Sequence, residues 1–337
     1  MKIFITGASG FIGGAIAKRL AKDHWVLGLA RSKEAYDKIA ALGVRPLTGS
    51  LETMGLGMLK ECDMVIHCAA YVKPWGSYQD FAEVNVEGTK HLLALAKEAG
   101  VKRFIHMGTE AALFYGQDMD DINETYPYPD HSPFPYSETK KLAEIAVLKA
   151  NVPNVFETIS LRPRLVWGPG DETILPNLVE MVDSGRFRWI GEGKFTTSTT
   201  YIGNLVDATL LAMEKGKAGE AYFITDWEIH TMRDFLTQLL ATEGRVPEDR
   251  NVPKWLARFL SQAFEAIYKL FRIRKKPPIT RFSAAIMSSN CTIASDRAQL
   301  DLGYEPAVTV AEGMQRMSKV PNFMKRQVEE DEEYTIV

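Results

Sequence analysis

The chain has 337 residues, which is enough for one large domain or two modest ones, each with its own core. Its composition is that of an ordinary globular protein, and a net charge of -3 argues against a nucleic-acid-binding protein. The three cysteines, Cys62, Cys68 and Cys291, have the spacing of neither a metal site nor a disulfide framework, which suits a reducing compartment. There is no basic-then-apolar leader and no apolar run near the ~20 residues of a membrane span, so we expect a cytoplasmic protein without a metal.

The first elements are a strand, a glycine-rich turn and a helix. Ile3–Ile5 are strand formers, glycines follow at positions 7, 10 and 13, and a helical pattern runs from Ala15 to Leu20. A dinucleotide-binding fingerprint needs this context, because its glycines permit the tight turn, the approach of a pyrophosphate and the packing of helix on strand. The N–H groups at the start of the helix would face the phosphates. The residues expected to bind a cofactor here are Gly7, Ser9, Gly10, Phe11, Ile12 and Gly13.

The end of the second expected strand, Trp25–Ala30, favours one cofactor over another. NAD-selective folds usually have an acid here, which holds the adenine ribose hydroxyls. This chain has Arg31, Ser32 and Lys33 instead, and Arg is well shaped to bind a phosphate. We therefore predict that Arg31 and Lys33 meet the 2′-phosphate of NADP(H), with NAD(H) as the second choice. The alternative interpretation is a solvated basic loop after a strand.

Further short apolar runs alternate with helical segments through the first half of the chain, at 44–47, 64–70 and 103–107. This alternation is typical of an α/β fold with a doubly wound parallel sheet, in which ligands bind at the carboxyl ends of the strands. Ala69 and Ala70 end one such run and are small enough for a cofactor to lie against them. His67 fits a packed or backbone-bonded histidine better than a ligand or catalyst.

The expected chemistry centres on a helix that begins near Tyr136, after a proline-rich loop. Residues four apart share a helix face, so Lys140 should lie beside Tyr136, whereas Lys141 points elsewhere. A nearby ammonium favours phenolate, so we expect a depressed pKa for Tyr136 and a role as general acid or base. Thr109 follows the strand at 103–107 and should face the same crevice. The Tyr-x-x-x-Lys spacing alone is common by chance, but its place after a fingerprint and a strand-end threonine makes it specific.

These motifs occur in the order found in extended short-chain dehydrogenase/reductases, and the chain resembles that superfamily. The matching residues are Thr6–Gly13, Asn85–Thr89, Thr109, Tyr136 with Lys140, and Leu161–Pro163 running into Gly168–Asp171. The resemblance implies a Rossmann-type sheet whose cofactor contacts include Pro163. It also implies Tyr136 as proton donor or acceptor and Lys140 as the residue that tunes it and binds the nicotinamide ribose. Thr109 would hydrogen-bond the substrate oxygen, and Asn85 would support a proton relay.

Two positions depart from the superfamily pattern. Ser50 stands where an aspartate is common near the adenine, so the adenine contacts are not predicted. Gly108 and Thr109 replace a serine pair, so a single hydroxyl would serve the substrate oxygen.

The resemblance also implies two units that are interleaved in sequence. Residues 1–167 and 201–228 would form the cofactor-binding domain, and residues 168–200 with 229–320 a smaller substrate-binding domain. A late strand is expected at 222–226. The remaining residues, 321–337, form an acidic tail that we expect to be solvated and mobile.

The choice of substrate depends on looser motifs. Sugar-nucleotide enzymes of the superfamily commonly have an asparagine shortly after the strand at 161–163, where it contacts the diphosphate; in this chain that place falls at Leu165. Other segments resemble the 3β-hydroxysteroid dehydrogenase branch and related reductases of long-chain 3-keto acids. They are Trp75-Gly76 with the preceding Lys73-Pro74, Pro277–Phe282, Asp296–Ala298 and Leu302–Pro306. An apolar substrate is therefore favoured over a nucleotide sugar.

The segment 252–276 combines a broad apolar stripe at helical spacing with many cations. The stripe consists of Val252, Leu256, Phe259, Leu260, Ala263, Phe264, Ile267, Leu270 and Phe271. The cations are Lys254, Arg258, Lys269, Arg272, Arg274, Lys275 and Lys276, and Glu265 is the one acid. Three interpretations stay open: a helix packed in the core, a lid over an apolar pocket, or a helix on an anionic membrane surface.

Together these features favour an NADP(H)-dependent oxidoreductase that interconverts an apolar secondary alcohol and ketone, either sterol-like or 3-oxoacyl. The alternatives are a nucleotide-sugar epimerase or dehydratase with retained NAD(H), and a non-catalytic redox-sensing binder. The expected partner is a small apolar substrate, with peripheral membrane contact through 252–276. Relatives often dimerise through the helices near Asn85 and Tyr136, so we expect a homodimer.

Overall fold

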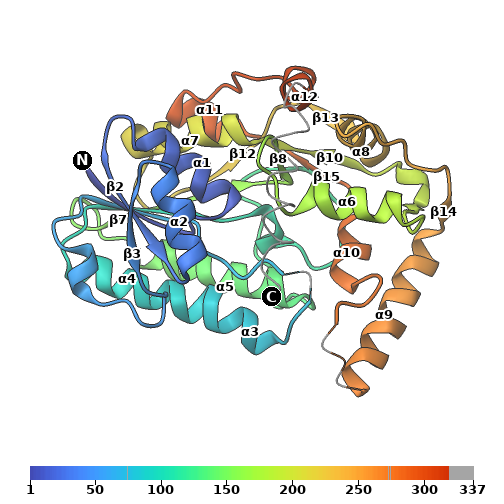
Figure 1. Ribbon diagram of the computed structural model, residues 1–337, viewed down its shortest axis with the longest axis horizontal. Coiled ribbons are helices and arrows are strands. Elements are labelled where there is room, and N and C mark those ends of the chain that lie inside the picture. The colour runs from blue at the N-terminus through green and yellow to red at the C-terminus, as the bar shows by residue number, and fades with distance from the viewer. Residues whose placement is uncertain (74, 272, 274, 319–337) are drawn as a thin grey trace, which may run out of the picture.

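The computed structural model of the protein describes residues 1–73, 75–271, 273 and 275–318. Its centre is a seven-stranded, fully parallel sheet with the strand order β12-β7-β5-β4-β1-β2-β3 (Figure 1). The strands are β1 (Lys2–Thr6), β2 (Trp25–Ala30), β3 (Arg45–Thr48), β4 (Met64–His67), β5 (Arg103–Met107), β7 (Glu157–Pro163) and β12 (Ala221–Ile224). The chain runs outward from β1 in both directions, which is the doubly wound Rossmann arrangement that the sequence predicts.

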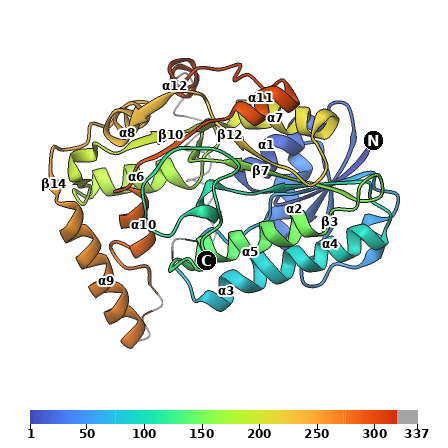
Figure 2. The same ribbon diagram turned by 180° about the vertical axis from the view of Figure 1, so that it is seen from behind.

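Helices cover both faces of this sheet, because side chains alternate between the two faces along each strand. Ile3 and Ile5 of β1 lie in one core, with α1 (Phe11–Leu20), α2 (Lys33–Ala41), α7 (Ile202–Lys215) and α11 (Asp296–Leu302). Phe4, between them, lies in the other core, with α4 (Gly88–Glu98) and α5 (Pro135–Lys149). Figure 2 shows α4 and α5 side by side across that face.

A continuous helical run leads into α4. It starts with α3 (Tyr78–Ala82), passes through one π-helical turn, η2 (Glu83–Glu87), and continues into α4. Ser77 and Asp80 form a reciprocal capping box at its start, the S-x-x-D signal of a helix N-terminus. Asn85 therefore lies inside the helical run, at the wide π turn.

A second, four-stranded sheet has the order β13-β10-β15-β6. Its strands are β6 (Met119–Ile122), β10 (Thr196–Ser198), β13 (Ile229–Thr231) and β15 (Cys291–Ile293). Two strand pairs complete the unit: β8 (Val166–Trp167) with β11 (Thr200–Tyr201), and β9 (Trp189–Ile190) with β14 (Asn251–Val252). The helices of this part are α6 (Ile174–Asp183), α8 (Met232–Ala241), α9 (Lys254–Leu270), α10 (Arg281–Ile286) and α12 (Val310–Ser318). Short 3₁₀ turns lie at η1 (Leu56–Leu59), η3 (Glu110–Leu113) and η4 (Gly191–Gly193).

The limits of the two predicted units remain a prediction. Two elements pack in the unit other than the one to which those limits assign them. Strand β6, within residues 1–167, pairs with β15 in the smaller sheet. Helix α11, within residues 229–320, buries Ala298 and Leu302 in the core of the large sheet. The acidic tail, Arg272, Arg274 and Pro74 lie outside the described residues. No helix in the described part of the chain is long and apolar enough to cross a membrane.

Candidate active site

The turn between β1 and α1 leaves room for a ligand's phosphates. Gly7 has φ +71°, and a Cβ added to it would lie 2.8 Å from the Ala69 nitrogen. A Cβ on Gly13 would lie 2.2 Å from the Gly7 carbonyl oxygen, so only glycine lets α1 approach the turn. The N-cap of α1 is Gly10, which has no capping side chain, and the first turn contains no acid. The free N–H groups of α1 therefore suit an anionic group such as a pyrophosphate.

The other predicted residues of this turn have mixed surroundings. Ser9 is partly buried in the turn. Phe11 and Ile12 pack against the apolar cluster around Trp167, so their side chains join α1 to the smaller unit. Ala69 and Ala70, after β4, are partly buried, and the Ala69 N–H donates to the Thr6 hydroxyl (3.1 Å).

The basic segment after β2 divides into three different roles. Ser32 is the N-cap of α2 and accepts a hydrogen bond from the Ala35 N–H at 3.1 Å. Lys33 forms an exposed ion pair with Asp37 at 2.9 Å. Arg31 is exposed and forms no ion pair with another residue that the structure describes. Of the two predicted phosphate ligands, Arg31 is the one whose charge is unshared.

His67, at the end of β4, has a structural role. The Thr89 hydroxyl donates to the Asn85 carbonyl oxygen at 2.7 Å, so it accepts from His67 Nε2 at 2.8 Å. His67 Nδ1 is then unprotonated and accepts from the Thr6 hydroxyl at 2.7 Å. Burial, reinforced by the charge of Lys140, lowers the pKa of His67 to about 3. The ring is neutral and tied to its neighbours, as the sequence analysis favours.

Tyr136 and Thr109 meet at the carboxyl end of β5. Tyr136 lies in the first turn of α5, whose N1 residue is Pro135, and Thr109 is the N-cap of η3. Burial and the neighbouring charge of Glu110 raise the pKa of the partly buried Tyr136, and a side-chain hydrogen bond with Thr109 works in the opposite direction. The net result is a phenol that stays protonated well above neutral pH.

The expected depression of the Tyr136 pKa by Lys140 is therefore wrong, and the direction in which Lys140 points explains why. Its ammonium donates to the Met107 carbonyl oxygen at 2.6 Å and lies 3.5 Å from His106 Nε2. Lys140 thus ties α5 to the end of β5 instead of contacting the phenol. Burial lowers its own pKa to about 8, although the charge of Glu144 acts in the opposite direction.

Asn85 uses its side chain to hold backbone in place. Its Oδ1 accepts from the Tyr71 N–H at 2.6 Å, and its Nδ2 donates to the Tyr71 carbonyl oxygen at 3.3 Å. Nδ2 also donates to the Thr139 hydroxyl at 3.1 Å, beside Lys140 on α5. The described contacts of Asn85 therefore fix the segment after β4 against α5, and its role in a relay stays a prediction.

A buried ion pair between Glu110 and Arg164 lies next to Thr109. The Thr109 hydroxyl donates to Glu110 Oε2 at 2.7 Å, and Glu110 Oε1 accepts from Arg164 Nη1 at 2.6 Å. Arg164 Nε donates to the Thr197 hydroxyl at 2.9 Å. The side chains of Glu110 and Arg164 are 4% and 1% exposed, so each depends on the other to compensate its charge.

A second buried network explains the glycine at position 108. Glu144 of α5 accepts from Arg162 Nε at 3.0 Å and from the Ser160 hydroxyl at 2.6 Å. A Cβ on Gly108 would lie 2.6 Å from the Ser160 Oγ and 2.8 Å from Glu144 Oε2. The carboxylate thus fills the space that the first serine of the superfamily pair would need.

Aromatic rings surround Tyr136. Its ring centroid lies 5.5 Å from that of Phe282 on α10 and 6.4 Å from that of Phe81 on α3. Phe134 packs on Phe282 at 5.6 Å and stacks on Phe114 at 5.5 Å. The phenol therefore stands among apolar groups, with hydroxyl and carboxylate groups on one side.

The segment after β7 has no polar group at the place of the sugar-nucleotide asparagine. Pro163 is buried as the last residue of β7 and pairs with Ile224. Leu165 has φ +44° and packs against the apolar cluster around Trp167. Its side chain offers nothing that could bind a diphosphate.

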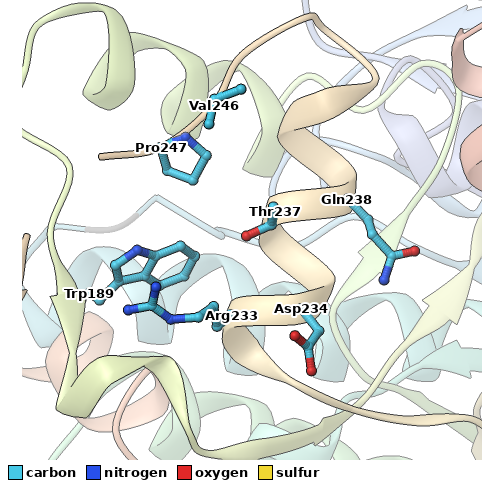
Figure 3. Close-up of a pocket in the computed structure, with 7 residues that line it drawn as sticks. All are labelled: Trp189, Arg233, Asp234, Thr237, Gln238, Val246 and Pro247. Atoms are coloured by element: carbon cyan, nitrogen blue, oxygen red, sulfur yellow. The ribbon is translucent and has the colours of Figure 1, made fainter. Parts of the chain in front are cut away.

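A separate hollow of about 490 Å³ lies in the smaller unit. Figure 3 shows the residues that line it. Residues from β9, α8 and the loop after α8 line it: Trp189, Arg233, Asp234, Thr237, Gln238, Val246 and Pro247. The Arg233 guanidinium lies over the Trp189 ring at 4.7 Å and pairs with Asp249 at 2.9 Å. None of these residues belongs to the candidate active site.

Comparison with known families decides the identity of the fold. Residues 4–253 match the model of the 3-beta hydroxysteroid dehydrogenase/isomerase family. The chain belongs to this family. It is thus an extended short-chain dehydrogenase/reductase, and it is an oxidoreductase acting on CH–OH groups.

Individual relatives match along nearly the whole chain. A 4-hydroxy-2-methyl-3-oxo-4-farnesyl-3,4-dihydroquinoline-1-oxide ketoreductase from Stigmatella aurantiaca is 36% identical over 318 residues, covering 93% of this chain and 95% of its own. A 2-alkyl-3-oxoalkanoate reductase from Stenotrophomonas maltophilia is 34% identical over 331 residues, covering 94% and 98%. The UDP-glucuronic acid 4-epimerase from Bacillus cereus, solved in complex with NAD, superposes with a TM-score of 0.74 over 97% of this chain and 99% of its own. At 22% identity, this last likeness bears on the fold alone.

Sequence reasoning missed three charged residues of the site: Glu110, Glu144 and Arg164. The sequence contains a signal for this cluster. Arg162 lies within the apolar strand at 157–163, and Arg164 directly follows that strand. Buried cations need carboxylate partners, so arginines in such a run indicate acids on neighbouring elements. Glu110, three residues after the end of β5, is one of these acids.

Proposed function

We propose that the protein is an NADP(H)-dependent oxidoreductase that interconverts an apolar secondary alcohol and ketone, of the sterol or 3-oxoacyl class. The observation that carries this proposal is the protonated Tyr136 phenol beside Thr109, among the rings of Phe81 and Phe282. A phenol in such surroundings suits an oxygen on an otherwise apolar molecule. The names of the two relatives, both reductases of ketones that bear apolar chains or rings, support the same class.

In the direction of ketone reduction, Tyr136 acts as the general acid. Its raised pKa keeps the proton available at neutral pH, and the phenol gives that proton to the carbonyl oxygen as negative charge develops there. In this structure the Thr109 hydroxyl donates to Glu110. When a ketone binds, this hydroxyl rotates and donates to the carbonyl oxygen instead. Together the two hydroxyls orient the ketone and stabilise the developing alkoxide.

Lys140 and the glycine turn would hold the cofactor. Once bound, the nicotinamide supplies the hydride. Lys140 gives one N–H to the Met107 carbonyl oxygen, and an ammonium has three donors, so it retains capacity for the nicotinamide ribose. The free N–H groups at the start of α1 would bind the pyrophosphate, with Gly7 and Gly13 giving it access.

The preference for NADP(H) depends on Arg31, whose guanidinium is exposed and unshared at the end of β2. A hydrogen bond to a charged partner is worth about 1.5–3 kcal/mol, so Arg31→Asp should raise the KM for NADPH by roughly 10- to 150-fold. The KM for NADH should fall or stay constant, because an acid can hold the ribose hydroxyls. Lys18→Asp, at an exposed cation elsewhere on α1, is the matched control. Unchanged NADPH kinetics in Arg31→Asp would refute the assignment of the phosphate site.

A nucleotide-sugar epimerase with retained NAD(H) is less well supported. The fold is compatible with that activity, but Leu165 packs in an apolar cluster where such enzymes need a diphosphate ligand. Purified protein should therefore carry no tightly retained NAD(H), which the absorbance and fluorescence of the denatured supernatant would show.

The test of the proposed reaction is NADPH oxidation against a panel of steroid ketones, 3-oxoacyl esters and UDP-sugars. Tyr136→Phe should lower kcat by about 10²- to 10⁴-fold on the responding ketones, because it removes the general acid. Tyr36→Phe, at an exposed hydroxyl on α2, is the matched control and should keep full turnover. A Tyr136→Phe protein with the turnover of the control would refute the mechanism.

A further inference from the structure

Helix α9 turns its apolar side away from the protein. The side chains of Trp255, Phe259 and Leu270 are 70%, 61% and 76% exposed, and Phe271, directly after the helix, is 69% exposed. Figures 1 and 2 show the helix extending away from the rest of the molecule. The side chains it does bury are those of Ala257 and Ser261. The core-packed interpretation of this stripe is therefore wrong.

Polar contacts fix this orientation from the inner side. Arg258 donates to the hydroxyls of Ser288 (3.1 Å) and Ser289 (2.9 Å). Glu265 accepts from the Arg281 N–H at 2.7 Å. In an ordinary surface helix the polar side faces water and the apolar side faces the core. Helix α9 instead turns Arg258 and Glu265 toward the protein and exposes much of its apolar stripe, and an exposed apolar face of this kind suits an apolar partner.

The charge around this face identifies the kind of partner. Between residues 254 and 276 the sequence has seven Lys or Arg residues and a single acid, although the whole chain has a net charge of -3. That acid, Glu265, is engaged with the Arg281 N–H and lies 3.7 Å from Lys269. Lys275 and Lys276 are exposed beyond the end of the helix. The exposed cations among the described residues of this segment, Lys269, Lys275 and Lys276, lie at the C-terminal end of the helix and beyond it. Cations beside exposed aromatic and aliphatic side chains complement a surface that is apolar inside and anionic at its edge.

We propose that the outer face of α9 binds to the surface of an anionic lipid bilayer. The helix lies in the plane of the headgroups, with Trp255, Phe259, Leu270 and Phe271 inserted among the acyl chains. The lysines contact the anionic headgroups, and their long stems allow the ammonium groups to stay in water. This is attachment without spanning, consistent with the absence of a membrane-crossing helix among the described residues.

The position of α9 links this surface to the candidate active site. Helix α10 packs on α9, and Phe282 of α10 lies 5.5 Å from the Tyr136 ring. Tyr268 of α9 contacts Trp75 edge-to-face at 6.4 Å, in the segment after β4. If the proposed function holds, an apolar ketone dissolved in the bilayer would have a short path to Tyr136. The binding itself does not depend on that reaction.

The test is cosedimentation of the full chain with vesicles, with no substrate present. Vesicles of phosphatidylglycerol mixed with phosphatidylcholine should bind the protein, and pure phosphatidylcholine vesicles should bind it at least about tenfold more weakly. The variant Trp255→Ser/Phe259→Ser/Leu270→Ser should lose about tenfold or more in partitioning. The matched control is Trp25→Ser/Val246→Ser/Leu300→Ser, whose side chains are 59%, 82% and 82% exposed outside α9. It should bind like the wild type.

A second variant tests the charge and does not touch the apolar face. Lys275→Glu/Lys276→Glu should weaken binding to the anionic vesicles and reduce its dependence on salt. Equal binding of the apolar triple variant and the wild type would overturn the proposal. So would a wild-type dimer, seen by sedimentation velocity, that the triple variant converts to monomer without any vesicle binding, because a second copy would then cover the face. The vesicle experiment measures binding and no turnover, so its outcome can be interpreted even if the proposed reaction is wrong.

Discussion

The surroundings of Tyr136 and the helix α9 differ in which side chains they bury. Around Tyr136, the buried charges of Glu110 and Glu144 each meet a buried arginine, within a shell of aromatic rings. On α9, Arg258 and Glu265 face the protein, whereas Trp255, Phe259 and Leu270 are exposed. In the first region the buried charges are compensated within one chain, whereas the second leaves large apolar side chains exposed. A helix pattern predicts which residues share a face, but the contacts of that face decide which way it points.

The largest expected effect on stability comes from breaking the buried ion pair between Arg164 and Glu110, next to Thr109. Arg164→Met leaves the Glu110 carboxylate buried without its partner, which should lower the free energy of unfolding by about 3–5 kcal/mol. Urea denaturation followed by circular dichroism would measure it. The double variant Glu110→Gln/Arg164→Met removes both charges and should be the more stable of the two. If it is no more stable than Arg164→Met, charge compensation is not what holds this centre together.

A smaller effect should appear when pH is varied through the titration of Lys140. Its folded-state pKa, about 8, lies below the ordinary 10.5. Between these values the unfolded chain holds a proton that the folded chain has lost, so the Lys140 contribution to the free energy of unfolding rises with pH in that window. Below about pH 8 the penalty of burying the charge is fully present. Subtracting the pH profile of Lys140→Met from that of the wild type should isolate this rise, and parallel profiles would contradict it.

The smallest effect should come from the outer face of α9. Phe259→Ser/Leu270→Ser changes side chains that are 61% and 76% exposed, so in the absence of lipid it should change the free energy of unfolding by less than about 1 kcal/mol. Phe235→Ser, on a fully buried ring of α8, is the contrasting variant and should cost several kcal/mol. A loss comparable to that of Phe235→Ser would mean that the outer face of α9 is packed after all.

Much of the fold could be predicted because its signals are local. The limits of β2 and β5 coincide with the apolar runs at 25–30 and 103–107. In the first turn, Gly7 and Gly13 leave no room for a Cβ, as the fingerprint predicts. The helical run that contains Asn85 begins at Tyr78, where Ser77 and Asp80 form a capping box, which is also a local signal.

The electrostatics of the site could not be predicted from spacing. Tyr136 and Lys140 do share a helix face, but the ammonium of Lys140 reaches a backbone carbonyl on β5, and only the fold brings that carbonyl near. Likewise, the raised pKa of Tyr136 depends on burial and on Glu110, which lies 26 positions earlier in the chain. Long-range contacts of this kind leave no periodic trace in a sequence.

The missing side chain at Gly108 has a consequence for how this protein can change. A Cβ at that position would lie 2.6 Å from the Ser160 Oγ and 2.8 Å from the Glu144 carboxylate, and shortening Glu144 deprives Arg162 of its counter-charge. Neither substitution is tolerable first unless the other sites adjust with it. Positions 108, 144, 160 and 162 should therefore be exchanged as a set, and a side chain at position 108 should not be accommodated by a single substitution.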